Sequence, residues 1–430
     1  MIRFSVHGAY WTILAIGISL IGFSSLYAQE EKKDIVIVDH ADSLIGLEIN
    51  GESARQLIGN VKLTHGKTVV TCNRAIQFRQ SNKVSLQGDV IVKDDSMTLF
   101  TQNGMYYGNE RIAEAFDGVR VEERTSTVRA KYGKYYTSER RANFKNEVSV
   151  EDSASRLTSN ELVYFRDSQK TIADGNVKIV NRENRITIFG EHFENNKSRE
   201  YSIMTVNPLA IQLDTAGVDK FDTLYIRSDT MKSYRQNVEE LITSGNVSLK
   251  RSGFLSESGL TIFYTKLDSI KMNISPVVWY EQNPKETTQV TGDSIFVKLE
   301  KRKLKRMNVR GNSLAVSQVD SVHRGRYHQM SGQDMVILFD SNTVRQIDID
   351  KTVTLLYYTF DGDEPNGLNK TTGDHGTMTF FDKKIDRVKV TGGVEGQYYP
   401  EKMVKGKEID YNITAFDWRT PRRSKKTVIN

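Results

Sequence analysis

Two histidines, His323 and His328, lie close together in the chain, and paired histidines are common zinc ligands. Their surroundings, Val322-His-Arg-Gly-Arg-Tyr-His328, are basic and contain no acidic cluster that would complete a set of ligands. The chain has a single cysteine, so a pair of thiolates cannot supply the missing ligands. We therefore predict no metal site and no cofactor.

Catalytic side chains are equally hard to group. The chain has no Gly-x-Ser-x-Gly, His-Glu-x-x-His or phosphate-binding glycine motif. Carboxylates are frequent, as in Asp94-Asp95 and Glu122-Glu123, but they fall at expected turns, where acidic side chains usually bind backbone N–H groups. We predict that the protein is not an enzyme. A carbohydrate-active β-helix enzyme is kept as a third hypothesis, because unaligned repeats do not exclude acids that converge on one face.

Cys72 is the only cysteine, so the chain cannot form an intramolecular disulfide. It lies in an alternating apolar segment and is expected to be a small buried hydrophobe. Stability must therefore come from strand pairing and a long apolar seam rather than from cross-links.

The elements that position these residues are repeats of one short pattern. The pattern is an apolar pair, a bend-forming Gly or Asn, a Val and an alternating tail, and it is clearest in Leu57-Ile-Gly-Asn-Val-Lys-Leu63. Its first five bend residues are 29, 30, 28 and 29 residues apart: Gly59, Gly88, Gly118, Asn146 and Gly175.

Diverged copies of the pattern fill the rest of the chain. A second piece recurs between the bends, in which a polar turn precedes an alternating apolar run, as in Thr158-Ser-Asn-Glu-Leu-Val-Tyr-Phe165. A period of two is typical of β-strands with one apolar face. We predict an all-β chain of about eleven units of 28–40 residues, in which the later copies lie at 206–211, 242–249, 274–278, 309–316, 349–355 and 390–396.

The N-terminus has the pattern of a secretory signal peptide. Arg3 precedes an uncharged apolar run at residues 10–26, and Ala28 precedes a sharply polar segment. We predict that residues 1–28 are cleaved and that the mature chain is exported. An uncleaved membrane anchor is the alternative, because the run has the length of a short membrane span.

The repeat spacing is weakest at residues 228–240, so we predict an N-terminal block at 29–227 and a diverged block at 228–418. Residues 231–240 are expected to form a short helix or a loop. Residues 419–430 contain five basic and no acidic side chains and are expected to be a disordered tail. When these five residues and Arg3 are set aside, 54 of the 60 basic residues remain, and the chain has 54 acidic residues. The repeat body is therefore formally neutral, and no nucleic-acid partner is predicted.

Several short phrases recur in a fixed order near the N-terminus: His40-Ala-Asp-Ser-Leu44, the bend Gly59-Asn-Val61, Gly66-Lys-Thr-Val-Val70 and the bend Leu86-Gln-Gly-Asp-Val90. In this order they resemble the OstA family of periplasmic organic-solvent-tolerance proteins, over roughly residues 34–180. The resemblance implies an elongated open β-jellyroll that carries lipopolysaccharide across the periplasm with its acyl chains shielded in an apolar groove. The chain departs from that family in its greater length, and it lacks the long alternating strands of an outer-membrane barrel.

The residues predicted to line such a groove are apolar residues of one parity. The alternative is that they form a dry core in a non-catalytic scaffolding β-solenoid of the cell envelope. The predicted lining residues are Leu57, Val61, Leu63, Ile76, Phe78, Val84, Leu86, Val90, Val92, Val119, Val121, Val148, Val150, Leu162, Tyr164, Val177 and Ile179.

The resemblance also implies partners. These are lipopolysaccharide or a related glycolipid, and inner- and outer-membrane transport components with similar jellyroll edges. Unpaired strand edges, expected at residues 35–38 and 44–49 on the N-terminal side, also make head-to-tail self-association possible. The expected location is the periplasm.

Overall fold

The computed structural model describes residues 36–422, apart from residues 66, 95–96, 218–219, 235–239, 265, 284–285, 301–302, 320–321, 324, 341–342 and 383. The predicted signal peptide lies outside the described residues. The described chain is almost entirely β-strand, as predicted, and every strand pairing resolved in it is antiparallel. It forms two compact units, an N-terminal unit (residues up to 183, with 189–199) and a C-terminal unit (residues 184–188 and from 200 on).

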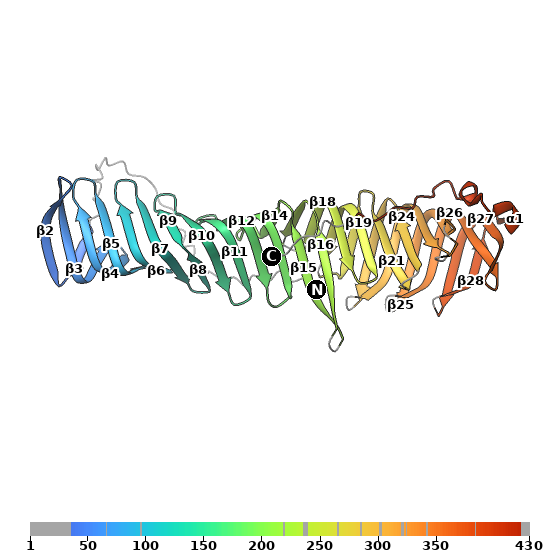
Figure 1. The fold of residues 1–430 in the computed structure, drawn as a ribbon, viewed down its shortest axis with the longest axis horizontal. Coiled ribbons are helices and arrows are strands. Elements are labelled where there is room, and N and C mark those ends of the chain that lie inside the picture. Colours follow the sequence, from blue (N-terminus) through green and yellow to red (C-terminus); the bar gives the residue numbers. More distant parts are fainter. Residues whose placement is uncertain are drawn as a thin grey trace, which may run out of the picture. The chain divides into compact units, whose positions relative to one another are not determined.

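Strands of the N-terminal unit follow one another in chain order (Figure 1). The division between the units falls within β13. The strands are β1 (Ile37–His40), β2 (Ser43–Ile49), β3 (Glu52–His65), β4 (Thr68–Phe78), β5 (Lys83–Lys93), β6 (Met97–Tyr107), β7 (Ile112–Glu123), β8 (Ser126–Ala130), β9 (Tyr132–Tyr136), β10 (Arg141–Asp152), β11 (Ser155–Phe165), β12 (Lys170–Asn181) and β13 (Ile186–Asn196).

The C-terminal unit is also built from successive antiparallel strands and ends in two short helical turns. Its elements are β14 (Tyr201–Thr205), β15 (Leu209–Gly217), β16 (Lys220–Arg227), β17 (Thr230–Tyr234), β18 (Glu240–Arg251), β19 (Phe254–Tyr264), β20 (Ser269–Asn273), β21 (Val277–Asn283), β22 (Glu286–Thr291), β23 (Ser294–Glu300), β24 (Lys303–Gln318), β25 (Tyr327–Asp340), β26 (Thr343–Asp361), β27 (Glu364–Phe381), β28 (Lys384–Thr391), β29 (Glu395–Pro400), α1 (Glu401–Val404) and the 3₁₀ turn η1 (Glu408–Tyr411).

Two expectations for residues 228–240 differ from the structure. Residues 230–234 form strand β17, which pairs with β14 and β18, so the alternative of a helix or loop was wrong for this segment. Strands β16 and β17 both pair with β18, so strand pairing continues through residue 228. The compact units therefore divide at residues 184–200 rather than at the point of weakest repeat spacing.

Each repeat bends at two consecutive residues with positive φ. Gly, Asn and Asp dominate these positions because they adopt the left-handed conformation at least cost. The bends confirm the eleven predicted repeats and lie at residues 59–60, 88–89, 117–118, 146–147, 175–176, 206–207, 245–246, 274–275, 311–312, 351–352 and 392–393.

An Asp or Asn of the neighbouring strand lies over many of the bends. At the bend 311–312, the backbone N–H of Asp293 donates to the carbonyl of Gly311 at 2.9 Å, and Asn312 Nδ2 donates to Asp293 Oδ1 at 3.2 Å. A Cβ at Gly311 would lie 2.0 Å from Asp293 Oδ2. Asp42 occupies the same position over Gly59, which explains the spacing between the Ala-Asp-Ser-Leu phrase and the Gly-Asn-Val bend.

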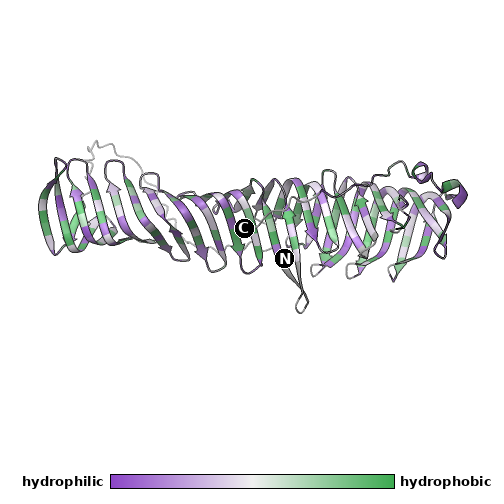
Figure 2. Ribbon diagram, in the orientation of Figure 1, coloured by the Kyte–Doolittle hydropathy of each residue, from purple (hydrophilic) through white to green (hydrophobic). Residues whose placement is uncertain are grey.

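The bends divide the strands into two arms. In a bend-carrying strand, the first arm precedes the bend and the second arm follows it. A return strand runs between two successive bend-carrying strands and pairs with both. The return strand between β7 and β10 consists of two separate pieces, β8 and β9. β8 pairs only with the second arms of β7 and β10, and β9 pairs only with their first arms. Along each strand, apolar and polar residues alternate (Figure 2). One apolar face of each arm therefore points toward the other arm.

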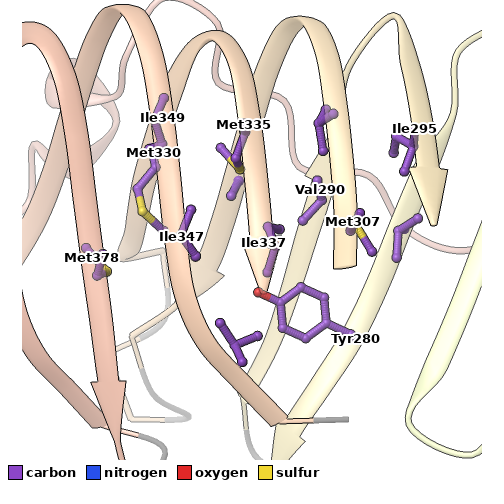
Figure 3. Packing of buried hydrophobic residues seen from close by; sticks show 14 of the residues in the cluster. Tyr280, Val290, Ile295, Met307, Met330, Met335, Ile337, Ile347, Ile349 and Met378 are labelled. Atoms are coloured by element: carbon purple, nitrogen blue, oxygen red, sulfur yellow. The ribbon is translucent and has the colours of Figure 1, made fainter. Parts of the chain in front are cut away.

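In the C-terminal unit, the two arms enclose a fully buried core. Val290, Ile295, Met307 and Ile337 have no exposed surface and belong to one cluster (Figure 3). Tyr280 of a second arm meets Phe339 of a first arm, with ring centroids 5.9 Å apart and an interplanar angle of 80°. The inner faces of this unit thus contact each other directly.

The opposite face of the second arms in this unit is covered by residues 412–422, which we call the strap. Ile413, Phe416 and Trp418 of the strap pack on Leu314, Val316, Leu356, Tyr358 and Leu368. This cluster is separate from the core between the arms. Residues 419–422, predicted to be part of a disordered tail, are held against the unit instead; the remainder of that tail lies outside the described residues.

Buried side chains hold the strap through its backbone. Gln289 Oε1 accepts from the N–H of Arg419 at 2.7 Å, and Gln289 Nε2 donates to the carbonyl of Asp417. Gln329 Oε1 accepts from the N–H of Ile413 at 3.0 Å. Neither glutamine has exposed surface. Because the amides bind backbone atoms, the strap is held in an extended conformation across several strands.

Candidate functional site

The inner face of the N-terminal unit consists of four rows of side chains, each crossing nine strand positions. Two rows flank the bends and are buried throughout. The first-arm proximal row is Leu57, Ala75, Leu86, Gly104, Ala115, Gly133, Phe144, Leu162 and Ala173. The second-arm proximal row is Val61, Cys72, Val90, Thr101, Val119, Ala130, Val148, Ser159 and Val177.

The other two rows lie farther from the bends and are mostly half-buried. The first-arm distal row mixes polar, aromatic and small residues: Arg55, Gln77, Val84, Tyr106, Ala113, Tyr135, Ala142, Tyr164 and Thr171. The second-arm distal row is entirely aliphatic: Leu63, Val70, Val92, Leu99, Val121, Val128, Val150, Leu157 and Ile179. In this aliphatic row, only Leu63 and Val121 are fully buried.

Fifteen of the seventeen predicted lining residues lie in these four rows. Ile76 and Phe78 do not, and their prediction was wrong. Ile76 pairs with Gln56 and Ser85, which puts it on the face opposite to Leu57 and Leu86. The cause is a bend in the return strand, where the register shifts between Thr71 and Arg74. That shift moves Ala75 to the inner face.

Sequence reasoning missed the small residues of the first-arm proximal row. Five of the nine residues in this row are Ala or Gly, and the middle three of these are consecutive across the strands: Ala75, Gly104, Ala115, Gly133 and Ala173. A Cβ at Gly133 would lie 3.1 Å from a methyl group of Val119, so Val119 would have to shift by a few tenths of an ångström. The signal in the sequence is the Asn at the bend of a return strand, as at Asn73 and Asn160, which lie over Gly88 and Gly175.

Charged side chains lie beyond the distal rows, at the free ends of the arms. Arg166 follows the first arm of β11, and Asp94 follows the second arm of β5; their side chains form an ion pair of 3.6 Å between opposite arms. Glu123, at the end of the second arm of β7, lies near both. Desolvation raises the pKa of Glu123, although the positive charges of Arg166 and Lys197 oppose this shift. We call Asp94, Glu123 and Arg166 the clasp.

The side chains of the four rows are mostly apolar. In the described part of the chain, no group of three or more His, Cys, Asp or Glu side chains is placed to hold a metal ion. His323 contacts Phe360, and His328 Nδ1 accepts from the backbone N–H of Tyr358, so the two histidines have separate structural contacts. Within the described residues there is also no helix long and apolar enough to cross a bilayer.

Comparisons with known proteins give a family match and similar solved structures. The chain is similar to LptH of Pseudomonas aeruginosa, described as the LptA homologous periplasmic component of the conserved lipopolysaccharide transport device. The identity is 14%, the match covers 35% of this chain and 96% of that chain, and the TM-score is 0.18. A search of curated proteins gives no match. The model of a family described as OstA-like protein matches residues 33–188. This segment, which contains the four rows, belongs to the OstA-like protein family.

Proposed function

We propose that the protein is a periplasmic bridge component that carries an acylated glycolipid of the lipopolysaccharide class, with its acyl chains held between the arms of the N-terminal unit. The observation that carries this proposal is the second-arm distal row. It is aliphatic at all nine positions, and seven of them are half-exposed. The membership of this segment in the OstA-like family favours the same function.

Shielding acyl chains requires a continuous apolar lining. Transfer of a methylene group from water to an apolar environment is favourable by about 0.8 kcal/mol, so a chain of a dozen carbons needs contact along its whole length. The distal row offers such contact across nine strand positions. In a protein with no ligand, this half-buried aliphatic surface would remain partly in water. A bound acyl chain would complete its burial.

The alternative function, a scaffold with a packed core, fits the C-terminal unit better. The core there is closed by the contact between Tyr280 and Phe339. The row of the second arms that corresponds to the aliphatic distal row contains Val290, Ala315, Met330 and Leu355, which are buried in the core cluster and are not half-exposed. We therefore place the lipid in the N-terminal unit and assign the C-terminal unit a structural part in the bridge.

Strand edges are the proposed contacts to other bridge components. β1 and β2 pair with β3, and among the described residues no other strand pairs with them. Leu44 and Ile45 in β2 are 58% and 47% exposed. At the other end of the chain, β28 and β29 both pair with β27. We propose that these edges add to similar edges of inner- and outer-membrane transport components or of a second copy.

Acyl-chain binding can be tested by making the distal row polar without changing its shape. In the triple variant Val92→Thr, Val128→Thr, Val150→Thr, each hydroxyl replaces a methyl group that would contact the chain. We expect the affinity for a fluorescent long-chain fatty acid to fall by up to about 60-fold, since each lost methyl contact costs about 0.8 kcal/mol at most.

A matched triple variant lies on the opposite face of the same arms. Val69, Ile91 and Val180 are neighbours of inner-face residues and are also half-buried. Val69→Thr, Ile91→Thr, Val180→Thr should leave fatty-acid binding unchanged. Equal losses in the two variants, or no binding by the unaltered protein, would rule out a lipid site between these arms.

A further inference from the structure

The clasp spans the two arms directly beyond the distal rows. Arg166 belongs to the first-arm ends, while Asp94 and Glu123 belong to the second-arm ends. Tyr164, two residues before Arg166, is the first-arm distal-row residue beside the clasp. The pKa of its hydroxyl is raised by burial and by the negative charge of Glu123 on the other arm. Polar groups of opposite arms therefore approach each other here, above an apolar row.

The ion pair that joins the arms is a weak one. Its N···O distance of 3.6 Å is longer than a charged hydrogen bond, and the two side chains are 33% and 21% exposed. Asp94 uses its other oxygen, Oδ1, to accept the N–H of Met97 at 2.9 Å. The contact between Asp94 and Arg166 is through one carboxylate oxygen, Oδ2. Arg166 also forms a side-chain hydrogen bond with Tyr135. A guanidinium group binds more strongly to an anion that accepts two parallel hydrogen bonds.

Within the clasp, the two arms contribute opposite charges. The first-arm side contributes Arg166, and the second-arm side contributes Asp94 and Glu123. The other turns at the ends of both arms contain basic as well as acidic residues, so this contrast is local to the clasp. An anion that approaches the clasp would be attracted by one side and repelled by the other. Its binding would thus take Arg166 away from the carboxylates and favour separation of the arms.

We propose that Arg166 binds the phosphate group of the amphiphile and that the phosphate displaces Asp94, which opens the clasp above the apolar rows. This inference rests on the proposed lipid function and adds the headgroup chemistry to it: the ligand is a phosphorylated amphiphile rather than a neutral one. The phosphate would accept two N–H donors from the guanidinium group, where Asp94 now offers one oxygen.

The test compares two probes that share one acyl chain, palmitoyl lysophosphatidic acid and monopalmitoylglycerol, below their critical micelle concentrations. Arg166→Gln should lower the affinity for the phosphate probe about tenfold, the usual loss for a bidentate charged contact, and leave that for the neutral probe unchanged. Asp94→Asn keeps the acceptor for Met97 but removes the competing charge. It should raise the affinity for the phosphate probe about threefold.

Arg140→Gln is the matched control. Arg140 lies in a turn at the same ends and pairs with Asp167 of the same arm at 3.1 Å, so it does not join the arms. Equal losses in Arg140→Gln and Arg166→Gln would overturn the proposal, because they would indicate general attraction by surface charge. Tighter binding of both probes by both clasp variants would also overturn the proposal. The ion pair would then only hold the arms together, and Arg166 would not bind the phosphate. If the unaltered protein binds neither probe, the proposed function itself fails.

Discussion

Gly311→Ala is expected to lower the free energy of unfolding of the C-terminal unit by about 3 kcal/mol. Two costs add. The residue has φ +71°, a conformation that costs an alanine about 1 kcal/mol. Its Cβ would also lie 2.0 Å from Asp293 Oδ2, so Asp293 must move and its contacts with Asn312 and the Gly311 carbonyl are lost. Denaturant unfolding followed by tryptophan fluorescence measures the change, because Trp279 and Trp418 both lie in this unit.

Gly362→Ala separates the two costs. Gly362 has φ +59°, and a Cβ there would meet nothing within 4 Å. Gly362→Ala should lower the free energy of unfolding by about 1 kcal/mol, which is the conformational cost alone. If Gly311→Ala and Gly362→Ala destabilise the unit equally, the Asp that lies over the bend makes no contribution, and our account of the repeat phrase is wrong.

The second large effect concerns the strap. In the double variant Gln289→Ala, Gln329→Ala, the N–H groups of Ile413 and Arg419 and the carbonyl of Asp417 lose their buried partners. Each such loss costs about 1 kcal/mol or more, so we expect the strap to detach about 100-fold more often. Hydrogen exchange at the N–H of Phe416 reports this, because that group bonds to the carbonyl of Ile413 within the strap and touches neither glutamine.

An exposed glutamine provides the control. Gln102 donates from its side chain to Asp89 in the N-terminal unit, far along the chain from the strap. Gln102→Ala should leave exchange at Phe416 unchanged. Unchanged exchange in the double variant as well would show that the apolar contacts of Ile413, Phe416 and Trp418 alone hold the strap.

Much of the fold was predictable because each bend depends on the types of two neighbouring residues. Two consecutive left-handed residues favour Gly, Asn and Asp, so the spacing of these residues revealed the repeats. Diverged bends such as Ile274-Ser275 were still found, because the flanking apolar residues kept their spacing. The prediction failed at Ile76 and Phe78, where the return strand bends at Asn73-Arg74 without a glycine and alternation alone assigns the wrong face.

Long-range features were not predictable. In the sequence, Gln289 and Gln329 look like ordinary polar residues on the outer face of alternating strands. They are buried because the strap, which is distant in the sequence, covers them. Arg166 and Asp94 meet because strands several positions apart bring their ends together, which no local pattern records. The lipid contacts of the lining residues stay a prediction.

The most direct test of the central claim is photo-cross-linking in living cells with a small diazirine amino acid at one of three positions. Val92 lies in the aliphatic distal row, Lys93 is its exposed neighbour on the opposite face, and Val388 packs against the core of the C-terminal unit. We predict a glycolipid adduct at Val92 and none at Lys93 or Val388. An exported, folded protein with no adduct at Val92, or with equal adducts at Val92 and Lys93, would contradict acyl-chain binding between the arms of the N-terminal unit.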